Sequence, residues 1–273
     1  MDAATFHRFC GIAYEQAGIT LGDSKEALVE ARVGKRMRAL GLATEREYLA
    51  YLENRANAEE IVNFLDVIST NHTSFFREPD HFELLRKTLG DWRQQGCRRL
   101  RMWSAASSTG EEPYTIAFTT TEVLDGSNID WLLLATDIST KVLARAEAGV
   151  YAASKVELLS RAQQKCFFER TGSTDELRVR QEIRNKVVFR RLNLATPPYP
   201  MRGPFDIIFC RNVMIYFDQV VRQRIISAME ELLAPSGLLI IGHAEALSGV
   251  RTSLRMLKPS VFLHSEEGPG VAL

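Results

Sequence analysis

The sequence predicts an α/β protein with an all-helical domain at its N-terminus and a small antiparallel β insertion in its sheet domain. Three observations support this fold class. The first 65 residues follow helical spacing, apolar runs alternate with helical patterns from residue 100 onward, and this alternation breaks once between residues 149 and 185. Apolar runs that alternate with helical patterns are typical of βαβ units in a parallel sheet.

The helical domain is predicted to contain four helices. Gly18 ends the first helix, Gly41 ends the second, and a capping box that starts at Thr44 begins the third. Asp23 or Ser24 is expected to cap the second helix. The four helices cover about residues 3–17, 24–40, 45–54 and 59–68.

The second predicted helix has basic residues beside its apolar stripe. A solvated helix face is the ordinary explanation for such charges. Glu26 and Glu30 lie elsewhere on the helix, so they do not neutralise these cations at i+4 spacing, and an acidic partner becomes the alternative. At about 100° per residue, the basic residues on this arc and at its flank are Lys25, Arg32, Lys35, Arg36 and Arg38.

A polar loop, TNHTSFFRE, connects the helical domain to the sheet domain. In one interpretation it is a helix linker that Thr73 or Ser74 caps, with Phe75 and Phe76 in the core. In the other, the loop ends in Arg77 so that this residue can bind a carboxylate at the entrance to the sheet domain. The residues alone leave both interpretations open.

The alternating apolar runs predict the elements of the sheet domain. Strict alternation over residues 176–183 predicts a strand of the antiparallel insertion. Residues 254–257 and 261–264 are expected to form a hairpin at the sheet edge, and a loose tail is expected from Glu266. The main strands are expected near residues 100–103, 131–135, 187–194, 204–209 and 238–241, and the helices near 113–124, 140–148 and 218–233.

Composition and charge limit the function classes. The chain has 273 residues, 45% hydrophobic and 25% charged, as in ordinary globular proteins. Its 34 basic residues balance 34 acidic ones, which disfavours a binder of nucleic acid. The four cysteines form no C-x-x-C pair, so no metal is expected. We expect a cytoplasmic protein without direct membrane insertion, because the sequence shows no secretion signal and no apolar run of membrane-spanning length.

The stretch WSAASSTGEEPY, residues 103–114, is typical of a strand, a tight loop and a helix N-terminus. Small side chains let a ligand approach the backbone, and such a loop at the end of a parallel strand is where a nucleotide-like ligand binds. Gly110 is the only glycine in the loop, so the stretch departs from the dinucleotide signature G-x-G-x-x-G. A single nucleoside with an amino-acid tail, such as S-adenosylmethionine, fits better than a dinucleotide.

Polar residues also follow the other predicted strands. Asp137 is placed to accept hydrogen bonds from ribose hydroxyls, although it could instead cap the next helix together with Ser139. Asn193 can pair with an adenine edge, and Arg211 and Asn212 follow a third strand. Because parallel strands end at one edge of a sheet, these residues are expected to lie together.

Five stretches, in this order, resemble the chemotaxis-receptor glutamate methyltransferases, the CheR-type family: TNHTSFFRE, WSAASSTGEEPYTIA, LLATDIS, FDIIFCRNVMIYFD and LLAPSGLLIIGHAEAL. The resemblance covers nearly the whole chain. It implies a receptor-docking helical domain and linker at residues 1–77. It also implies a Rossmann-like S-adenosylmethionine-dependent methyltransferase domain at residues 78–273, with an inserted β-subdomain at about 150–186.

The implied activity is protein-glutamate O-methylation. A methyl group would pass from S-adenosylmethionine to glutamate side chains on the cytoplasmic helical region of chemoreceptors, leaving S-adenosylhomocysteine, for adaptation in chemotaxis-type signalling. A monomer is expected. The insertion, FERTGSTDELRVRQEI, looks shorter and less glycine-rich than in members that dock on a receptor's C-terminal pentapeptide, which puts that tether in doubt.

The resemblance further implies roles for individual residues. Tyr216 would lie by the methyl group and Arg77 close to the transfer site, both as catalytic residues. The basic residues Arg32, Lys35, Arg36 and Arg38 would meet the acidic receptor. The cofactor contacts would come from Asn71, Thr73, Arg77, Glu111, Glu112, Asp137, Asn193, Leu194, Arg211 and Asn212, with Glu112 and Glu111 at the methionyl amino group.

Two alternatives remain beside the enzyme. The chain could be a non-catalytic module that senses S-adenosylmethionine or S-adenosylhomocysteine and docks a signalling partner. It could also be a small-molecule or RNA methyltransferase, which the zero net charge disfavours for RNA. By periodicity alone, Tyr216 would be a buried aromatic between Ile215 and Phe217, and His243 a structural histidine.

Overall fold

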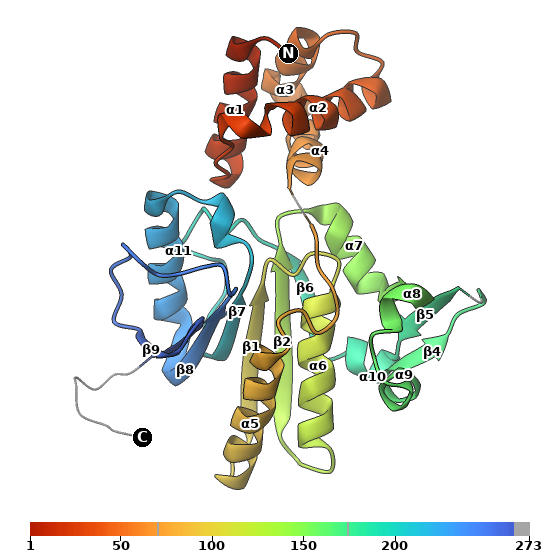
Figure 1. Cartoon of the computed structure of the whole chain (residues 1–273), viewed down its shortest axis with the longest axis vertical. Coiled ribbons are helices and arrows are strands. Elements are labelled where there is room, and N and C mark those ends of the chain that lie inside the picture. Colours follow the sequence, from red (N-terminus) through yellow and green to blue (C-terminus); the bar gives the residue numbers. More distant parts are fainter. Residues whose placement is uncertain (70, 174, 265–273) are drawn as a thin grey trace.

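The computed structural model of the chain describes residues 1–69, 71–173 and 175–264. A helical domain lies at one end of an open, twisted sheet that helices cover on both faces (Figure 1). The tail predicted from Glu266 lies outside the described residues. No helix in these three ranges is long and apolar enough to cross a membrane.

The helical domain has the predicted four helices, and three of the expected signals are confirmed. Gly18 ends the first helix in the left-handed conformation. Gly41 ends the second helix in the left-handed conformation, and the Thr44–Glu47 capping box begins the third. The predicted caps of the second helix are wrong, because a 3-10 turn over Asp23–Lys25 delays the helix until Glu26. The elements are α1 (Ala3–Ala17), η1 (Asp23–Lys25), α2 (Glu26–Leu40), α3 (Glu45–Glu53), η2 (Arg55–Asn57) and α4 (Ala58–Ile68).

A buried ion pair joins α2 to α4 inside this domain. Arg36 donates from Nε and Nη2 to the two carboxylate oxygens of Glu60, each at 2.7 Å, and Tyr48 adds a hydroxyl bond of 2.8 Å. The Glu60 side chain is 5% exposed. Burying a carboxylate is costly unless a cation and hydrogen bonds compensate it, so these three residues form one unit. Phe9 packs on Tyr48 and on Phe64 beside it.

The main sheet has seven strands in the order β6-β2-β1-β7-β8-β10-β9. The strands from β6 to β8 are parallel, and β10 and β9 form the predicted antiparallel hairpin at one edge. The strands are β1 (Arg99–Ala105), β2 (Asp130–Asp137), β6 (Val187–Arg191), β7 (Phe205–Cys210), β8 (Leu233–Ile241), β9 (Arg255–Lys258) and β10 (Val261–Leu263), and the helices packed on them are α5 (Asp80–Gln94), α6 (Glu111–Leu124), α7 (Thr140–Ala148) and α11 (Gln219–Leu232).

Successive residues of the central strands face opposite sides of the sheet. Met102 and Ile207 pack with α5 and α6, whereas Trp103 and Ile208 pack with α11. Both faces are buried, which explains why the strands appear in the sequence as continuous apolar runs. The core on the α11 face continues into the helical domain, so the two domains share one apolar cluster.

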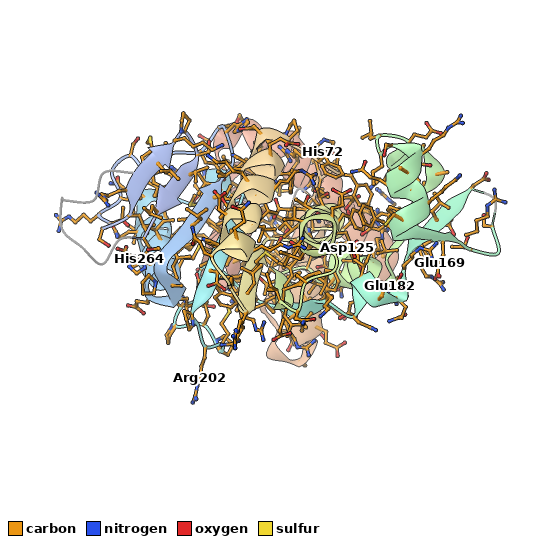
Figure 2. All side chains as sticks on the ribbon, turned by 90° about the horizontal axis from the view of Figure 1, so that it is seen from below. His72, Asp125, Glu169, Glu182, Arg202 and His264 are labelled. Carbon is orange, nitrogen blue, oxygen red and sulfur yellow. The ribbon has the colours of Figure 1, made fainter. Side chains whose placement is uncertain are left out.

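The insertion is a separate three-stranded antiparallel sheet in the order β3-β5-β4. The strand predicted for residues 176–183 is too long, because β5 ends at Val179 and a helical turn that buries Ile183 replaces its second half. Figure 2 shows the insertion, marked by Glu169, at the opposite end of the molecule from the C-terminal hairpin, marked by His264. The elements are β3 (Val150–Ala152), α8 (Ala153–Val156), α9 (Arg161–Phe167), β4 (Phe168–Arg170), β5 (Glu176–Val179) and α10 (Gln181–Arg184).

The segment after α1 attaches the helical domain to the sheet domain. Thr20 donates its backbone N–H to Tyr216 O at 2.8 Å, beside an isolated bridge between Ile19 and Phe217. Gly18 has φ 68°, and a Cβ there would lie 2.6 Å from Cβ of Ala195, so only glycine fits this contact.

Replacing Arg36 by Met is expected to lower the free energy of unfolding by about 3 kcal/mol, because Glu60 would keep a buried charge without its cation. Urea unfolding followed by circular dichroism measures this change. Lys35→Met, on an exposed neighbour, is the control and should shift stability by less than about 0.5 kcal/mol. Equal stabilities of the Arg36 variant and the unchanged protein would contradict the structural role of the pair.

Candidate active site

A cavity of about 520 Å³ lies where the parallel strands end. Figure 1 shows the helical domain at this end of the sheet. Its volume is in the usual range for small-molecule sites. Residues from α1, η1 and α2 line it together with the linker and the strand ends. The predicted site residues that line the cavity are Arg32, Asn71, Thr73, Arg77, Glu112, Asp137, Asn193, Leu194, Arg211, Asn212 and Tyr216.

The β1–α6 loop, residues 106–110, forms one wall of the cavity. Ala106, Ser108 and Gly110 all have positive φ, so the chain turns sharply between the strand and the helix. Ser107 N donates to Thr136 O, and Ser108 Oγ donates to Asn71 O in the linker. Ala106 and Ser108 line the cavity, as expected for small residues that let a ligand approach.

Asp137 accepts two backbone hydrogen bonds at the end of β2 and faces the cavity. Its Oδ2 accepts from Ser108 N at 2.8 Å and its Oδ1 from Ser139 N at 2.9 Å, while Ser139 itself caps α7. Asp137 also lines the cavity, and a carboxylate has acceptor capacity beyond these two bonds. Burial raises the pKa of its carboxyl group above the ordinary value.

A buried arginine connects three segments of the chain below the cavity. The Arg211 guanidinium, 1% exposed, donates to Glu112 Oε2 at 2.9 Å and to Glu78 Oε2 at 3.0 Å, and it lies over the ring of Phe82. Burial raises the pKa of Glu112, which Ser104 Oγ also contacts at 2.8 Å. For Glu78, burial is outweighed by Asn212 and Arg211, and its pKa is lowered.

Glu245 is a residue beside the site that the sequence interpretation missed. Its Oε2 accepts from Asn212 N at 2.8 Å and from Gly242 N at 2.6 Å, and its Oε1 accepts from Met214 N at 2.7 Å. These bonds fix Asn212 in the left-handed conformation, with φ 58°. The sequence feature that could have identified Glu245 is the acidic residue in GHAEAL, the stretch that follows the strand β8.

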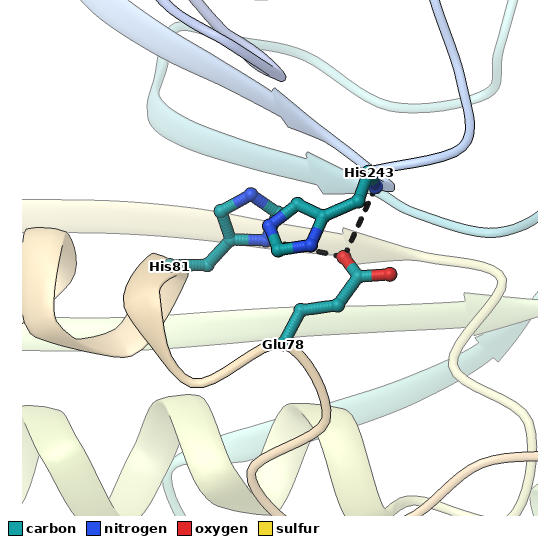
Figure 3. Close-up of side chains that lie close together, drawn as sticks. All are labelled: Glu78, His81 and His243. Carbon is teal, nitrogen blue, oxygen red and sulfur yellow. Dashed lines mark hydrogen bonds and ion pairs between the residues drawn. The ribbon is translucent and has the colours of Figure 1, made fainter.

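Glu78 lies next to two histidines, His81 and His243, in Figure 3. Their ligand atoms lie within 4.8 Å of one another, a spacing at which a metal ion could be considered. Glu78 Oε2, however, already accepts from Arg211 and from His243 N, and His243 Nε2 lies 3.1 Å from Asp80. Burial lowers the pKa of His81 to about 4, so this ring is neutral at pH 7. Hydrogen bonds therefore account for Glu78 and His243, whereas both ring nitrogens of His81 are buried without a hydrogen-bond partner among the described residues.

Tyr216 and Arg77 face the same cavity from distant parts of the sequence. Tyr216 is half-buried, whereas Phe217 is buried and Ile215 exposed, so the interpretation of Tyr216 as a core aromatic is wrong. Its hydroxyl has no hydrogen-bond partner among the described residues. The Arg77 guanidinium donates to His72 O at 2.9 Å, which holds it at the cavity wall.

Three predicted roles need correction. Glu111 does not line the cavity, because its fully buried side chain pairs with Lys155 of the insertion. Arg36 is committed to Glu60 and is therefore not a docking residue. Arg32 lines the cavity and donates to Ile68 O and Ser69 O at the end of α4, which leaves Lys35 and Arg38 as the exposed cations predicted on α2.

Asn193 also has a role that its sequence position did not reveal. Its Nδ2 donates to Gln16 O at 2.8 Å, and its Oδ1 accepts from Ala195 N at 3.0 Å. The side-chain amide thus joins the end of α1 to the sheet domain. The cavity wall beside it is apolar and consists of Ile138, Leu192 and Leu194.

These features together define the class of protein. An apolar wall suits an adenine ring, Asp137 suits ribose hydroxyls, and Glu112 offers a carboxylate to an ammonium group. Nε of Arg211 is buried without a hydrogen-bond partner among the described residues, and Arg211 lines the polar end of the cavity beside Glu112. The donor set fits S-adenosylmethionine, and the chain is an S-adenosylmethionine-dependent methyltransferase.

Comparisons with known proteins then identify the family. Residues 71–263 match the model described as CheR methyltransferase, SAM binding domain, and residues 4–69 match CheR methyltransferase, all-alpha domain. The chain therefore belongs to the CheR methyltransferase family. It is 42% identical to the chemotaxis protein methyltransferase of Salmonella typhimurium, covering 98% of this chain and 92% of that protein.

Two further matches are a second relative by sequence and a solved structure. The chemotaxis protein methyltransferase of Escherichia coli is 41% identical, with 98% of this chain and 93% of that protein covered. Among solved structures, PKMT2 from Rickettsia typhi in complex with AdoHcy is 17% identical, with a TM-score of 0.33 over 52% of this chain and 20% of that chain.

Replacing Glu245 by Gln is expected to weaken S-adenosylhomocysteine binding by about tenfold, the scale of one lost charged hydrogen bond. A glutamine side chain has only one acceptor oxygen, so its NH₂ group would face at least one of the backbone N–H groups that now donate to the Glu245 carboxylate. Isothermal titration calorimetry measures the dissociation constant, and Glu231→Gln, on an exposed residue of α11, is the control. Unchanged binding would show that the Asn212 backbone does not depend on Glu245.

Proposed function

We propose that this protein transfers the methyl group of S-adenosylmethionine to glutamate side chains on the cytoplasmic helical region of chemoreceptors. The observation that carries the proposal is the convergence of Arg77, Tyr216 and the strand-end residues in one cavity, with a basic helix at its edge. Membership of the CheR methyltransferase family supports it. The cytoplasmic location and the monomeric state stay predictions.

The cofactor roles follow from the chemistry of the cavity walls. Glu112 is assigned to the methionyl amino group, and Arg211 keeps Glu112 oriented through the 2.9 Å ion pair. Asp137 is assigned to the ribose hydroxyls, and Leu194 to the adenine ring. Asn71, Thr73 and Asn212 complete the polar wall. When bound, S-adenosylmethionine supplies a methyl group activated by the positive charge of its sulfonium.

The transfer needs alignment rather than a general base. A glutamate carboxylate is ionised at neutral pH and is already a nucleophile. Its oxygen forms the new bond to the methyl carbon while the carbon–sulfur bond breaks, and the electron pair stays on sulfur to give the thioether product. Correct positioning of reactants is worth roughly 7 to 11 kcal/mol. We assign this positioning to the Tyr216 hydroxyl and to the cation of Arg77.

Cations continue from the cavity along one side of the helical domain. Lys25 and Arg32 line the cavity, and Lys35 and Arg38 follow on the exposed surface of α2. An acidic receptor helix on this surface would bring a carboxylate to the cavity opening. Attraction between such charges mainly raises the association rate and depends on salt.

The non-catalytic sensing module is the alternative. It would use the same cavity and the same basic helix, but it would not need a phenol hydroxyl and a guanidinium facing the cavity beside the assigned tail site. The presence of both Tyr216 and Arg77 on the cavity wall therefore favours the enzyme.

Incubation with S-adenosylmethionine labelled in its methyl group and with chemoreceptor cytoplasmic fragments is expected to yield base-labile label on the receptor. Tyr216→Phe is expected to lower kcat by at least tenfold while changing the S-adenosylhomocysteine dissociation constant less than twofold, because the hydroxyl is assigned to alignment. Tight cofactor binding without label transfer to any of a range of receptor fragments would favour the sensing module instead.

Reversing the charges of Lys35 and Arg38 to Glu is expected to lower receptor methylation at low substrate concentration by about tenfold, an effect that shrinks at high salt. The dissociation constant of S-adenosylhomocysteine should not change, because neither residue lines the cavity. Lys87→Glu with Arg98→Glu makes the same charge change on exposed residues of the sheet domain. Equal losses of receptor methylation in the two double variants would exclude α2 as the docking surface.

A further inference from the structure

The β insertion contacts the β1–α6 loop and the residue that follows it. Tyr151 of β3 donates its hydroxyl to Thr109 O at 2.8 Å, and the same hydroxyl lies 2.6 Å from where a Cβ of Gly110 would be. Lys155 of α8 places its Nζ 2.5 Å from Glu111 Oε1. Three consecutive residues between the loop and α6 therefore depend on the insertion for their packing or hydrogen bonds.

Glu111 is the residue for which this contact matters most. Its side chain is 0% exposed, while that of Lys155 is 51% exposed. The second carboxylate oxygen accepts from Thr109 Oγ1 at 2.6 Å, so Glu111 also holds the loop residue two positions before it. A fully buried carboxylate needs a cation and hydrogen bonds, because removing its partner leaves an uncompensated charge. Lys155 supplies that cation from outside the main sheet.

The other side of the loop is held by the main sheet and the linker. Ser107 and Ser108 are bonded to Thr136 and Asp137 at the end of β2, and Ser108 to Asn71. These bonds fix the first half of the loop. In the second half, Thr109 O accepts from Tyr151 of the insertion, and Gly110 lies between Tyr151 and Ala146 of α7, with its N–H bonded to Ser107 O. Glu112, the cavity carboxylate, follows Glu111 directly on α6.

We propose that Lys155 is a positioning residue for cofactor binding, which acts through Glu111 on the β1–α6 loop and thereby connects the β insertion to the cofactor cavity. Neither Lys155 nor Glu111 lines the cavity. Their ion pair holds the second half of the loop and the first turn of α6, where Glu112 faces the cofactor. Coupling of this kind is reciprocal: a ligand that moves Lys155 also changes cofactor affinity.

The test is a set of variants whose S-adenosylhomocysteine dissociation constants are measured by calorimetry on the full chain. Lys155→Met is expected to raise the dissociation constant by about tenfold, within the usual range of coupling between sites. Lys155→Arg is expected to restore binding to within about threefold, because the charge returns. Lys165→Met removes an exposed lysine from the same insertion and is expected to bind like the unchanged protein.

A double-variant cycle separates positioning from simple stability. Glu111→Gln removes the buried charge, so adding Lys155→Met to it is expected to weaken binding by less than about twofold further. The proposal is overturned if the Lys155→Met variant binds S-adenosylhomocysteine as tightly as the Lys165→Met variant. It is also overturned if Lys155→Met weakens binding as much in the Glu111→Gln variant as in the unchanged protein. Since binding is measured without a receptor, the result does not depend on whether glutamate is the methyl acceptor.

Discussion

The ion pair of Arg211 with Glu78 and Glu112 is the interaction on which the rest of the site depends. A guanidinium that is 1% exposed is stable in the fold only when anions surround it. Its two carboxylates come from the linker just before α5 and from the start of α6, so one cation holds the linker, the first strand-to-helix connection and the end of β7 together. Glu245, in the segment that follows β8, completes this arrangement by accepting from Asn212 N and Met214 N.

The helical domain forms part of the cavity wall. Gln16 at the end of α1 is bonded to Asn193, Thr20 in the segment after α1 is bonded to Tyr216, and α2 contributes Arg32 to the cavity wall. The cofactor site and the basic surface thus share one helix. A receptor that binds α2 would also cover the cavity and exclude water, which strengthens electrostatic interactions inside it.

Charge is distributed unevenly although the formal net charge is zero. Acidic side chains next to the cavity, such as Glu78 and Glu245, accept hydrogen bonds from buried donors. Cations on the exposed surface of α2 remain available to solvent. Under the proposed function, the carboxylate of Glu112 at the cavity would face the ammonium group of the cofactor, while the exposed cations of α2 would attract an acidic protein. The insertion adds a further cation, Lys155, which pairs with the buried carboxylate of Glu111.

The sequence by itself determined the fold class, most element positions and the set of strand-end residues, because periodicity and caps are local and parallel strands all end at one sheet edge. Their positions after predicted strands were enough to place Asp137 and Arg211 at the site, and both line the cavity. Only the tertiary structure decided the partners of Arg36, Glu111 and Asn193. Those partners lie 24, 44 and 177 positions away in the chain, and no local pattern encodes which distant side chain reaches a given carboxylate or amide.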